Sequence, residues 1–261
     1  MSTRFLGVEL AAWRPAHGPK RIAAFVDHTL LKPEATRAQV LALCGEAKRH
    51  RFAAVCVNPY WVPLAAEELT DSGVPVATVC GFPFGATCFR AKAFEAKEVV
   101  KHGAVEVDMV AALGRMKSGD WGYVSDDIGA VVEAAAGAVV KVILETAALT
   151  LDEIVRGCEA ARDGGAHFVK TSTGFHPAGG ASVEAVRLMR ETVGDSLGVK
   201  ASGGIRDCVT ALRMLAAGAS RIGTSSGAAL VGCLGPEPLP LEALLAHPEA
   251  HAASCRAAAS R

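Results

Sequence analysis

Two lysines carry the clearest chemical signal in this chain, because each stands directly after a short apolar run and just before a loop of small residues. Lys170 follows Phe168 and Val169 and precedes Thr-Ser-Thr-Gly, while Lys200 follows Val199 and precedes Ala-Ser-Gly-Gly. A stretch with helical spacing separates the two runs, so they are predicted to be neighbouring parallel strands. The two ammonium groups would then share one site.

Two ammonium groups on neighbouring strands repel each other. Such strands lie about 5 Å apart, and two unit charges about 6 Å apart at an effective dielectric constant of about 20 repel by roughly 3 kcal/mol. That energy lowers the pKa of one lysine by about 2 from its usual value of about 10.4, and burial lowers it further. A neutral lysine amine attacks carbonyl carbons. The alternative is a pair of solvated surface lysines, and the rest of the chain decides between the two.

Two earlier apolar runs also carry ionisable side chains. Glu106 and Asp108 alternate with apolar residues in one run, and Lys141 and Glu145 lie four positions apart in the next. Alternate residues of a strand face the same side, so each pair is predicted to share one face. The interior of a parallel barrel is normally apolar, so charges that converge there need partners or a chemical role.

We interpret Asp108, together with the two lysines, as a catalytic candidate. Glu106, Lys141 and Glu145 are favoured as a supporting network of paired charges. Asp27 ends the first apolar run, and it either joins this network or caps the turn that follows. The sequence leaves both roles of Asp27 open.

Small-residue loops after the seventh and eighth apolar runs indicate a phosphate site. Barrels of parallel strands often hold phosphate at these two positions. Glycine lets backbone N–H groups approach phosphate oxygens, serine hydroxyls add donors, and a helix N-terminus adds partial positive charge. The candidates, in these loops and in the loop after Lys170, are Gly174, Gly203, Gly204, Arg206, Gly223, Ser225 and Ser226.

Apolar runs bounded by turn residues predict the elements that must position these groups. The predicted strands span about 22–27, 52–57, 75–81, 104–110, 139–145, 167–172, 198–202 and 220–224. Stretches with helical spacing lie at 38–50, 60–71, 90–102, 120–136, 151–163, 182–193 and 207–217. Helix starts are marked by Ser182 and Asp207, and helix ends by Gly73, Gly103, Gly165 and Gly218.

Eight strands that alternate with helices favour one α/β domain, a single (β/α)8 TIM barrel over about 21–235. The segments 1–20 and 236–261 extend this domain, and the second is predicted to place a terminal helix on the barrel. An open doubly wound sheet is the alternative fold. It is disfavoured because no G-x-G-x-x-G follows the first strand.

Composition narrows the class of partner. The 261 residues include 27 basic and 27 acidic side chains, and this zero net charge gives no reason to expect nucleic acid or an anionic membrane as a partner. No run reaches 18 consecutive apolar residues and no signal peptide is evident, so we expect a soluble, cytoplasmic protein. The eight cysteines include no C-x-x-C and are expected to be reduced core thiols, and no metal site is predicted.

Several strings in the sequence together resemble one enzyme family. They begin at Asp27 (DHTLLK), Gly81 (GFP), Glu106 (EVDMV), Lys117 (KSGDW), Ile143 (ILET), Lys170 (KTSTG), Lys200 (KASGGIR) and Gly223 (GTSS). With these strings, the sequence from about residue 22 to 230 resembles the deoxyribose-phosphate aldolases. This resemblance implies a class I aldolase that reversibly cleaves 2-deoxy-D-ribose 5-phosphate to D-glyceraldehyde 3-phosphate and acetaldehyde, without a metal or organic cofactor.

The resemblance also implies roles for individual residues. The Schiff-base lysine of the family falls on Lys170, its second lysine on Lys200, and its proton-relaying aspartate on Asp108. Two departures are present: some members have a lysine after T-S-T-G, where this chain has Phe175, and many end in a tyrosine, whereas this chain ends in Arg261.

Two other functions stay open at this point. One is a Schiff-base aldolase or transaldolase that acts on another sugar phosphate. The other is a barrel that binds a phosphorylated metabolite without converting it, which the three catalytic candidates disfavour. A homodimer is the expected assembly only because it is the commonest one.

Overall fold

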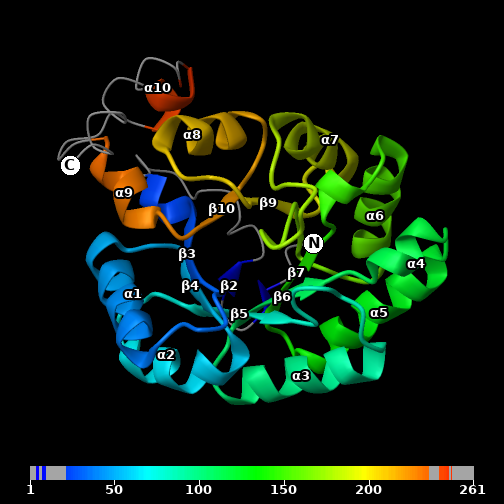
Figure 1. The fold of residues 1–261 in the computed structure, drawn as a ribbon, viewed down its shortest axis with the longest axis horizontal. Coiled ribbons are helices and arrows are strands. Elements are labelled where there is room, and N and C mark those ends of the chain that lie inside the picture. The colour runs from blue at the N-terminus through cyan, green and yellow to red at the C-terminus, as the bar shows by residue number, and fades with distance from the viewer. Residues whose placement is uncertain (1–3, 6–7, 10–21, 235–240, 247, 249–261) are drawn as a thin grey trace.

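The computed structural model describes residues 4–5, 8–9, 22–234, 241–246 and 248, and eight of its strands close into a parallel barrel (Figure 1). Around the barrel the order is β10, β3, β4, β5, β6, β7, β8, β9. Their bounds are β3 Val26–Leu30, β4 Ala54–Val57, β5 Val76–Cys80, β6 Glu106–Val110, β7 Val139–Ile143, β8 Phe168–Lys170, β9 Gly198–Ser202 and β10 Arg221–Thr224. Two further strands, β1 (Arg4–Phe5) and β2 (Val8–Glu9), form an antiparallel pair. The predicted (β/α)8 fold is confirmed.

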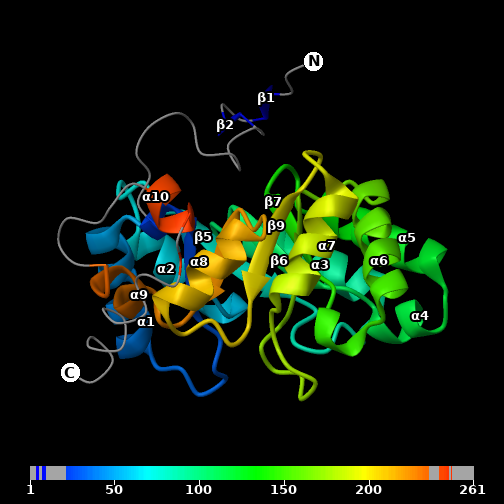
Figure 2. The same cartoon turned by 90° about the horizontal axis from the view of Figure 1, so that it is seen from above.

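The strand register brings the two lysines together. Lys170 of β8 pairs directly with Lys200 of β9, and Asp108 of β6 pairs with Lys141 of β7. The barrel closes where Gly223 of β10 pairs with Asp27 of β3. In Figure 2 the loops that follow β3 (blue) and β8 (yellow-green) extend from the same end of the barrel, which is the end where such barrels carry their active sites.

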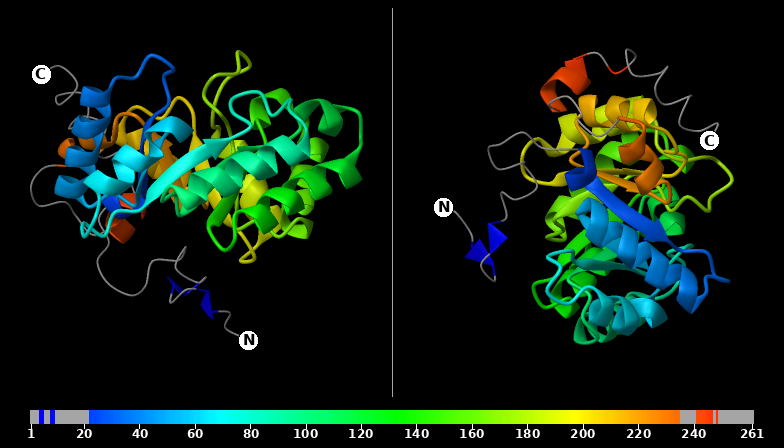
Figure 3. Two further views of the ribbon diagram at one scale, coloured as in Figure 1. Left: turned by 90° about the horizontal axis from the view of Figure 1, so that it is seen from below. Right: turned by 90° about the vertical axis from the view of Figure 1, so that its left-hand side faces the viewer.

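Helices surround the barrel on its outer side (Figures 1 and 3). The long ones are α1 Arg37–His50, α2 Val62–Glu68, α3 Phe89–Lys101, α5 Trp121–Ala134, α6 Leu151–Asp163, α7 Val183–Val193 and α8 Cys208–Ala216. The shorter ones are α4 Leu113–Lys117, α9 Gly227–Gly232, α10 Leu241–Ala246 and the 3₁₀ turns η2 Ile22–Phe25, η3 Pro59–Trp61 and η4 Thr146–Ala148.

Local sequence explains most of these boundaries. Ser182 and Asp207 cap α7 and α8 through side-chain oxygens that accept hydrogen bonds from backbone N–H groups, as predicted. Thr36 and Thr150 form capping boxes at the starts of α1 and α6. The glycines predicted to end helices all have the left-handed backbone that favours glycine: Gly73, Gly103, Gly165 and Gly218.

Some predicted boundaries were wrong. The first apolar run is not a strand throughout, because Ile22–Phe25 forms a 3₁₀ turn and β3 begins only at Val26. A short apolar run does not distinguish these two conformations by its pattern. The short helices α4 and α9 were not predicted. The predicted terminal helix is present as α10, which packs on α8 and buries Leu244, while residues 249–261 lie outside the described part of the chain.

Apolar side chains form two separate groups. The larger one lies between the strands and the surrounding helices and includes Val107, Val142 and Val199. The smaller one lies on the β3–β5 side, and we call it the inner apolar cluster; its members are Leu31, Ala54, Cys56, Ala77 and Val79, with Phe82 packed against them. The described cysteines are all free thiols, and no helix in the described residues is long and apolar enough to cross a membrane.

Candidate active site

Charged side chains from six strands converge inside the barrel, and we call them the ionic cluster. Alternation along each strand directs them inward, while their neighbours in sequence face the helices. All are buried except Arg221, which is slightly exposed. The members are Asp27 (β3), Glu106 and Asp108 (β6), Lys141 (β7), Lys170 (β8), Lys200 (β9) and Arg221 (β10).

Asp108 lies at the centre of the ionic cluster. Its Oδ2 atom is 2.8 Å from the Nζ atom of Lys170 and 2.7 Å from that of Lys200, and its Oδ1 atom is 2.7 Å from the Nζ atom of Lys141. The carboxylate of Asp108 therefore contacts both Lys170 and Lys200, the two lysines singled out in the sequence. The structure brings the three catalytic candidates into direct contact.

A second set of contacts supports this centre. Asp27 accepts hydrogen bonds from Lys200 at 2.5 Å and from Arg221 at 2.7 Å, so it belongs to the ionic cluster. Glu106 pairs with Lys141 at 2.6 Å and with Arg221 at 3.2 Å, in the supporting role that was favoured. Arg221 was missed by the sequence analysis. Its position in the last apolar run, beside Ile222, was the available signal.

Glu145 does not join this network, contrary to the sequence prediction. β7 ends at Ile143, and Glu145 adopts a left-handed backbone with φ 62° and ψ 54°, so the strand alternation no longer applies to it. Its buried carboxylate accepts hydrogen bonds from the Oγ1 and the backbone N–H of Thr173, with the hydroxyl contact at 2.5 Å. Glu145 thus holds the loop that follows Lys170 in place through these hydrogen bonds.

The charges of the ionic cluster do not cancel when every group is ionised. The cluster holds three carboxylates, from Asp27, Glu106 and Asp108, and four cationic side chains. Buried charge without a partner is costly. The loss of one proton from one lysine makes the cluster neutral, so the arrangement itself favours one uncharged amine.

The two neighbouring lysines differ in their surroundings. Burial lowers the pKa of Lys170 below the ordinary lysine value, Lys200 lowers it further, and Asp108 offsets these effects only in part. Burial also acts to lower the pKa of Lys200, but Asp108 and Asp27 outweigh burial and raise that pKa. Opposite shifts in adjacent groups separate their chemical roles. The shifts therefore favour proton loss from Lys170 over proton loss from Lys200.

The carboxyl of Asp108 is held ionised. Burial acts to raise its pKa, but Lys141, Lys170 and Lys200 together outweigh burial and hold the pKa well below the usual range. A carboxylate in contact with both lysines can accept and return a proton during a reaction at Lys170.

The phosphate candidates lie around the same end of the barrel. Gly174 is exposed, and a Cβ atom built on it would be 3.8 Å from the Cα of Gly203, so the loops after β8 and β9 are adjacent. Gly203 and Gly204 both have left-handed backbone, with φ 88° and 81°. Arg206 is exposed in the same loop.

The remaining candidates belong to β10 and the turn after it. Ser225 is exposed and Ser226 partly buried just before α9, and the backbone N–H of Ser226 donates to Thr224 Oγ1 at 2.9 Å. Gly223 lies within the strand, where a Cβ atom would come within 3.0 Å of the Cε of Lys200. The missing side chain therefore leaves room for that lysine.

Hydrogen bonds tie the loops after β8 and β9 together. Thr171 Oγ1 donates to the carbonyl of Ser202 and accepts from its N–H, both at 3.0 Å, and Ser202 Oγ donates to the carbonyl of Ser172 at 2.6 Å. The described residues hold no group of three or more His, Cys, Asp or Glu arranged for a metal ion. The arrangement can do carbonyl chemistry at the amine of Lys170, with the carboxylate of Asp108 in contact with that amine and with the ammonium group of Lys200.

The sequence and the fold are similar to those of known proteins. The family model described as "DeoC/LacD family aldolase" matches residues 21–231. The deoxyribose-phosphate aldolase of Mannheimia succiniciproducens is 54% identical over 213 residues, which are 82% of this chain and 95% of that protein. The deoxyribose-phosphate aldolase of Enterococcus faecalis is 56% identical over 207 residues, 79% of this chain and 94% of that protein. The tetrameric deoxyribose phosphate aldolase from Aeropyrum pernix superimposes with a TM-score of 0.78 at 32% identity, covering 87% of this chain and 97% of that one.

Proposed function

Because the chain belongs to the DeoC/LacD family of aldolases, we propose that it is a class I aldolase that cleaves 2-deoxy-D-ribose 5-phosphate reversibly. The products are D-glyceraldehyde 3-phosphate and acetaldehyde. The single observation that carries the mechanism is the contact of Asp108 with two lysines whose pKa values shift in opposite directions.

The reaction begins at Lys170. Its neutral amine adds to the C1 aldehyde of the open-chain sugar, and loss of water gives a protonated imine. Removal of the proton from the C3 hydroxyl lets the C2–C3 bond break, and its electron pair moves into the imine to form an enamine. C3 leaves as the aldehyde of D-glyceraldehyde 3-phosphate. Protonation of the enamine at C2 and hydrolysis of the imine release acetaldehyde and restore Lys170.

The neighbouring groups supply charge and protons. Lys200 keeps Lys170 unprotonated by its own positive charge and assists proton movement. Asp108 acts as acid and base through a water molecule. Asp27, Lys141, Glu106 and Arg221 hold these two groups in place through the contacts described above. The imine itself withdraws the electron pair, so the proposed steps use only these side chains.

The phosphate of the substrate is proposed to bind at the loops after β8, β9 and β10. Glycines with left-handed backbone bring N–H groups and serine hydroxyls to one end of the barrel, which supports this position. The residues are Gly174, Gly203, Gly204, Arg206, Gly223, Ser225 and Ser226.

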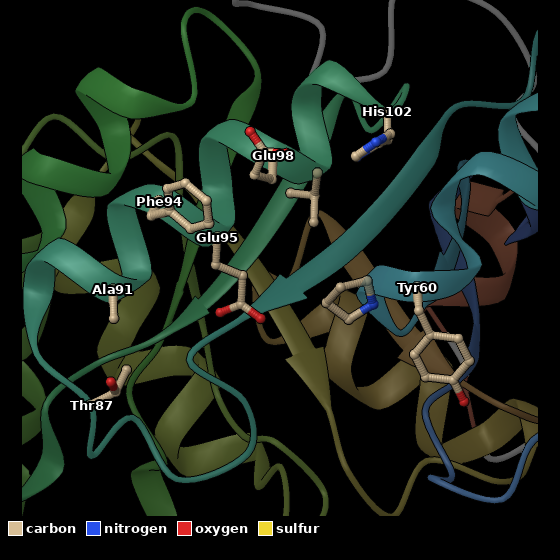
Figure 4. Close-up of a pocket in the computed structure, with 9 residues that line it drawn as sticks. Tyr60, Thr87, Ala91, Phe94, Glu95, Glu98 and His102 are labelled. Carbon is tan, nitrogen blue, oxygen red and sulfur yellow. The ribbon is translucent and has the colours of Figure 1, made fainter.

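For the assembly we propose a homodimer formed through the outer face of α3. Phe94 of α3 is 67% exposed and Tyr60 of η3 is 60% exposed, and both line a groove of about 530 Å³ (Figure 4). Arg90 and Glu98 lie one helical turn on either side of Phe94. Two α3 helices that meet antiparallel about a two-fold axis would place Phe94 against its copy and Arg90 against Glu98 of the partner subunit. Light scattering should give the mass of a dimer for the wild type and that of a monomer for Phe94→Glu. Equal masses for the two proteins would contradict the proposed interface.

We further place the enzyme in the cytoplasm, in deoxyribonucleotide catabolism and carbohydrate degradation, as one domain that spans residues 1–261. The chemistry of the proposed substrate, a deoxyribose phosphate, supports the catabolic role, and the family model that matches residues 21–231 supports a single domain.

The decisive experiment is borohydride reduction in the presence of acetaldehyde, followed by peptide mass spectrometry. The ethyl group should appear on the peptide that contains Lys170. A label on Lys200 would reverse the two lysine roles, and no label at all would indicate a binding protein without turnover. Retro-aldol assays across a panel of sugar phosphates separate this substrate from that of another Schiff-base aldolase.

A further inference from the structure

The end of the barrel that carries Lys170 has an apolar side as well as a charged one. The ionic cluster occupies the strands from β6 round to β3, whereas the inner apolar cluster lies on β4 and β5 and at Leu31, just after β3. Phe82, which follows β5, packs on the inner apolar cluster. A substrate bound at Lys170 therefore meets carboxylates and ammonium groups on one side and hydrocarbon on the other.

An aromatic pair crosses from this apolar side to the loop of Lys170. The rings of Phe82 and Phe175 meet edge to face, with centroids 5.2 Å apart and an interplanar angle of 85°. Phe175 follows Gly174 directly and is 48% exposed, so about half of its surface is accessible. The two loops that carry the pair follow β5 and β8, and β6 and β7 lie between these strands in the barrel.

Both partners of the pair are held by buried or half-buried carboxylates. Glu145 fixes Thr173, and Thr173 Oγ1 in turn accepts the backbone N–H of Phe175 at 3.1 Å. On the other side, Glu95 of α3 accepts the N–H of Gly81 at 2.7 Å, and its carboxylate points toward the end of β5 (Figure 4). Each of the two loops is thus held by its own carboxylate, and together these loops position the pair of rings.

We propose that Phe82 and Phe175 form an aromatic wall that contacts the carbon chain of the acceptor aldehyde, and that Glu145 is its positioning residue. The inference rests on the proposed aldolase function. In the proposed binding mode the carbon chain of the substrate runs from Lys170 Nζ to the loops at Gly174 and Gly203, and Phe175 directly follows Gly174 in the first of these loops. The wall binds carbon rather than phosphate, so it gives the enzyme affinity for short aliphatic aldehydes that carry no phosphate.

A series of unphosphorylated 3-hydroxyaldehydes tests the wall. Cleavage of 3-hydroxypentanal, 3-hydroxyhexanal and 3-hydroxyheptanal releases acetaldehyde and an acceptor that grows by one methylene each time. A fully buried methylene favours binding by about fourfold, so contact with a half-exposed ring should raise kcat/KM by roughly twofold per methylene. In Phe175→Ala and Phe82→Ala this rise should disappear. Phe84→Ala is the matched control, because Phe84 lies in the same loop but is 80% exposed.

The aromatic pair should also act as a unit. We expect each single substitution to lower kcat/KM about 3- to 10-fold on deoxyribose and on deoxyribose 5-phosphate alike, and the double variant to lose little more than either single one. Equal dependence on chain length in wild type and Phe175→Ala would overturn the proposal. So would a loss confined to the phosphorylated sugar.

Glu145 is tested through Thr173. Glu145→Ala removes the acceptor for the Thr173 hydroxyl, and Thr173→Val removes that hydroxyl, so both should weaken the chain-length dependence, and the double variant should match the singles. A structural role alone would change melting temperature but not the dependence on chain length. Borohydride trapping at Lys170 in every variant keeps this test separate from the proposed function, because a variant that still forms the imine retains the aldolase chemistry.

Discussion

Replacement of Lys200 by methionine should move the pH dependence of imine formation. Lys170 and Lys200 both contact the same oxygen of Asp108, at 2.8 and 2.7 Å, so their nitrogens are no more than about 5.5 Å apart, the sum of these distances. At an effective dielectric constant of about 20, two unit charges at that separation repel by about 3 kcal/mol, which corresponds to a pKa change of about 2. Without Lys200, the protonated form of Lys170 is no longer opposed, so the pKa of Lys170 rises.

The higher pKa of Lys170 in Lys200→Met should lower the rate of imine formation. Below the pKa of Lys170 the fraction of neutral amine falls tenfold per pH unit, so Lys200→Met should slow imine formation up to about 100-fold near neutral pH. The rate should recover as the pH increases, with the acid limb of the profile displaced upward by about 2. The assay is the rate of cyanoborohydride trapping with acetaldehyde between about pH 5 and 10.

Lys141→Met provides a matched control for this shift. Lys141 carries the same charge in the same ionic cluster but contacts the other oxygen of Asp108, and Lys200 is the cation with the larger effect on the pKa of Lys170. Removal of Lys141 should displace the acid limb less than removal of Lys200. An acid limb of Lys200→Met that coincides with the wild-type limb, in folded protein, would refute the reasoning that Lys200 keeps Lys170 neutral.

Two further predictions concern the proton relay and the phosphate site. Asp108→Asn should remove most turnover while circular dichroism shows an intact fold, because the amide keeps the shape of the carboxylate but cannot carry a proton; near-normal kcat would make Asp108 a structural residue. Ser226→Ala removes a donor worth about 1.5 to 3 kcal/mol to a charged partner, and Gly204→Val adds a branched side chain to left-handed backbone. Both should raise KM for deoxyribose 5-phosphate far more than for unphosphorylated deoxyribose, and equal losses on the two sugars would place the phosphate elsewhere.

Much of the site was predictable because it depends on strand periodicity. The alternation of residues in β6 placed Glu106 and Asp108 on one face, and the positions of the two lysines at the ends of successive runs predicted their pairing in register. Helix caps and the glycines at helix ends fixed the spacing between the strands. Local sequence therefore determined the (β/α)8 barrel and the convergence of Asp108, Lys170 and Lys200.

Other features depended on contacts between distant parts of the chain, and only the tertiary structure decided them. Arg221 joins the ionic cluster because β10 closes the barrel against β3, and Glu145 leaves it because the backbone turns left-handed after β7. The edge-to-face pair of Phe82 and Phe175 depends on two loops anchored by different carboxylates. Residue spacing alone could not say which lysine loses its proton more readily, although the family resemblance placed the Schiff base on Lys170. The pKa of each lysine depends on the carboxylates around it in three dimensions: Lys200 contacts both Asp27 and Asp108, whereas Lys170 contacts Asp108 alone and shares it with two other cations.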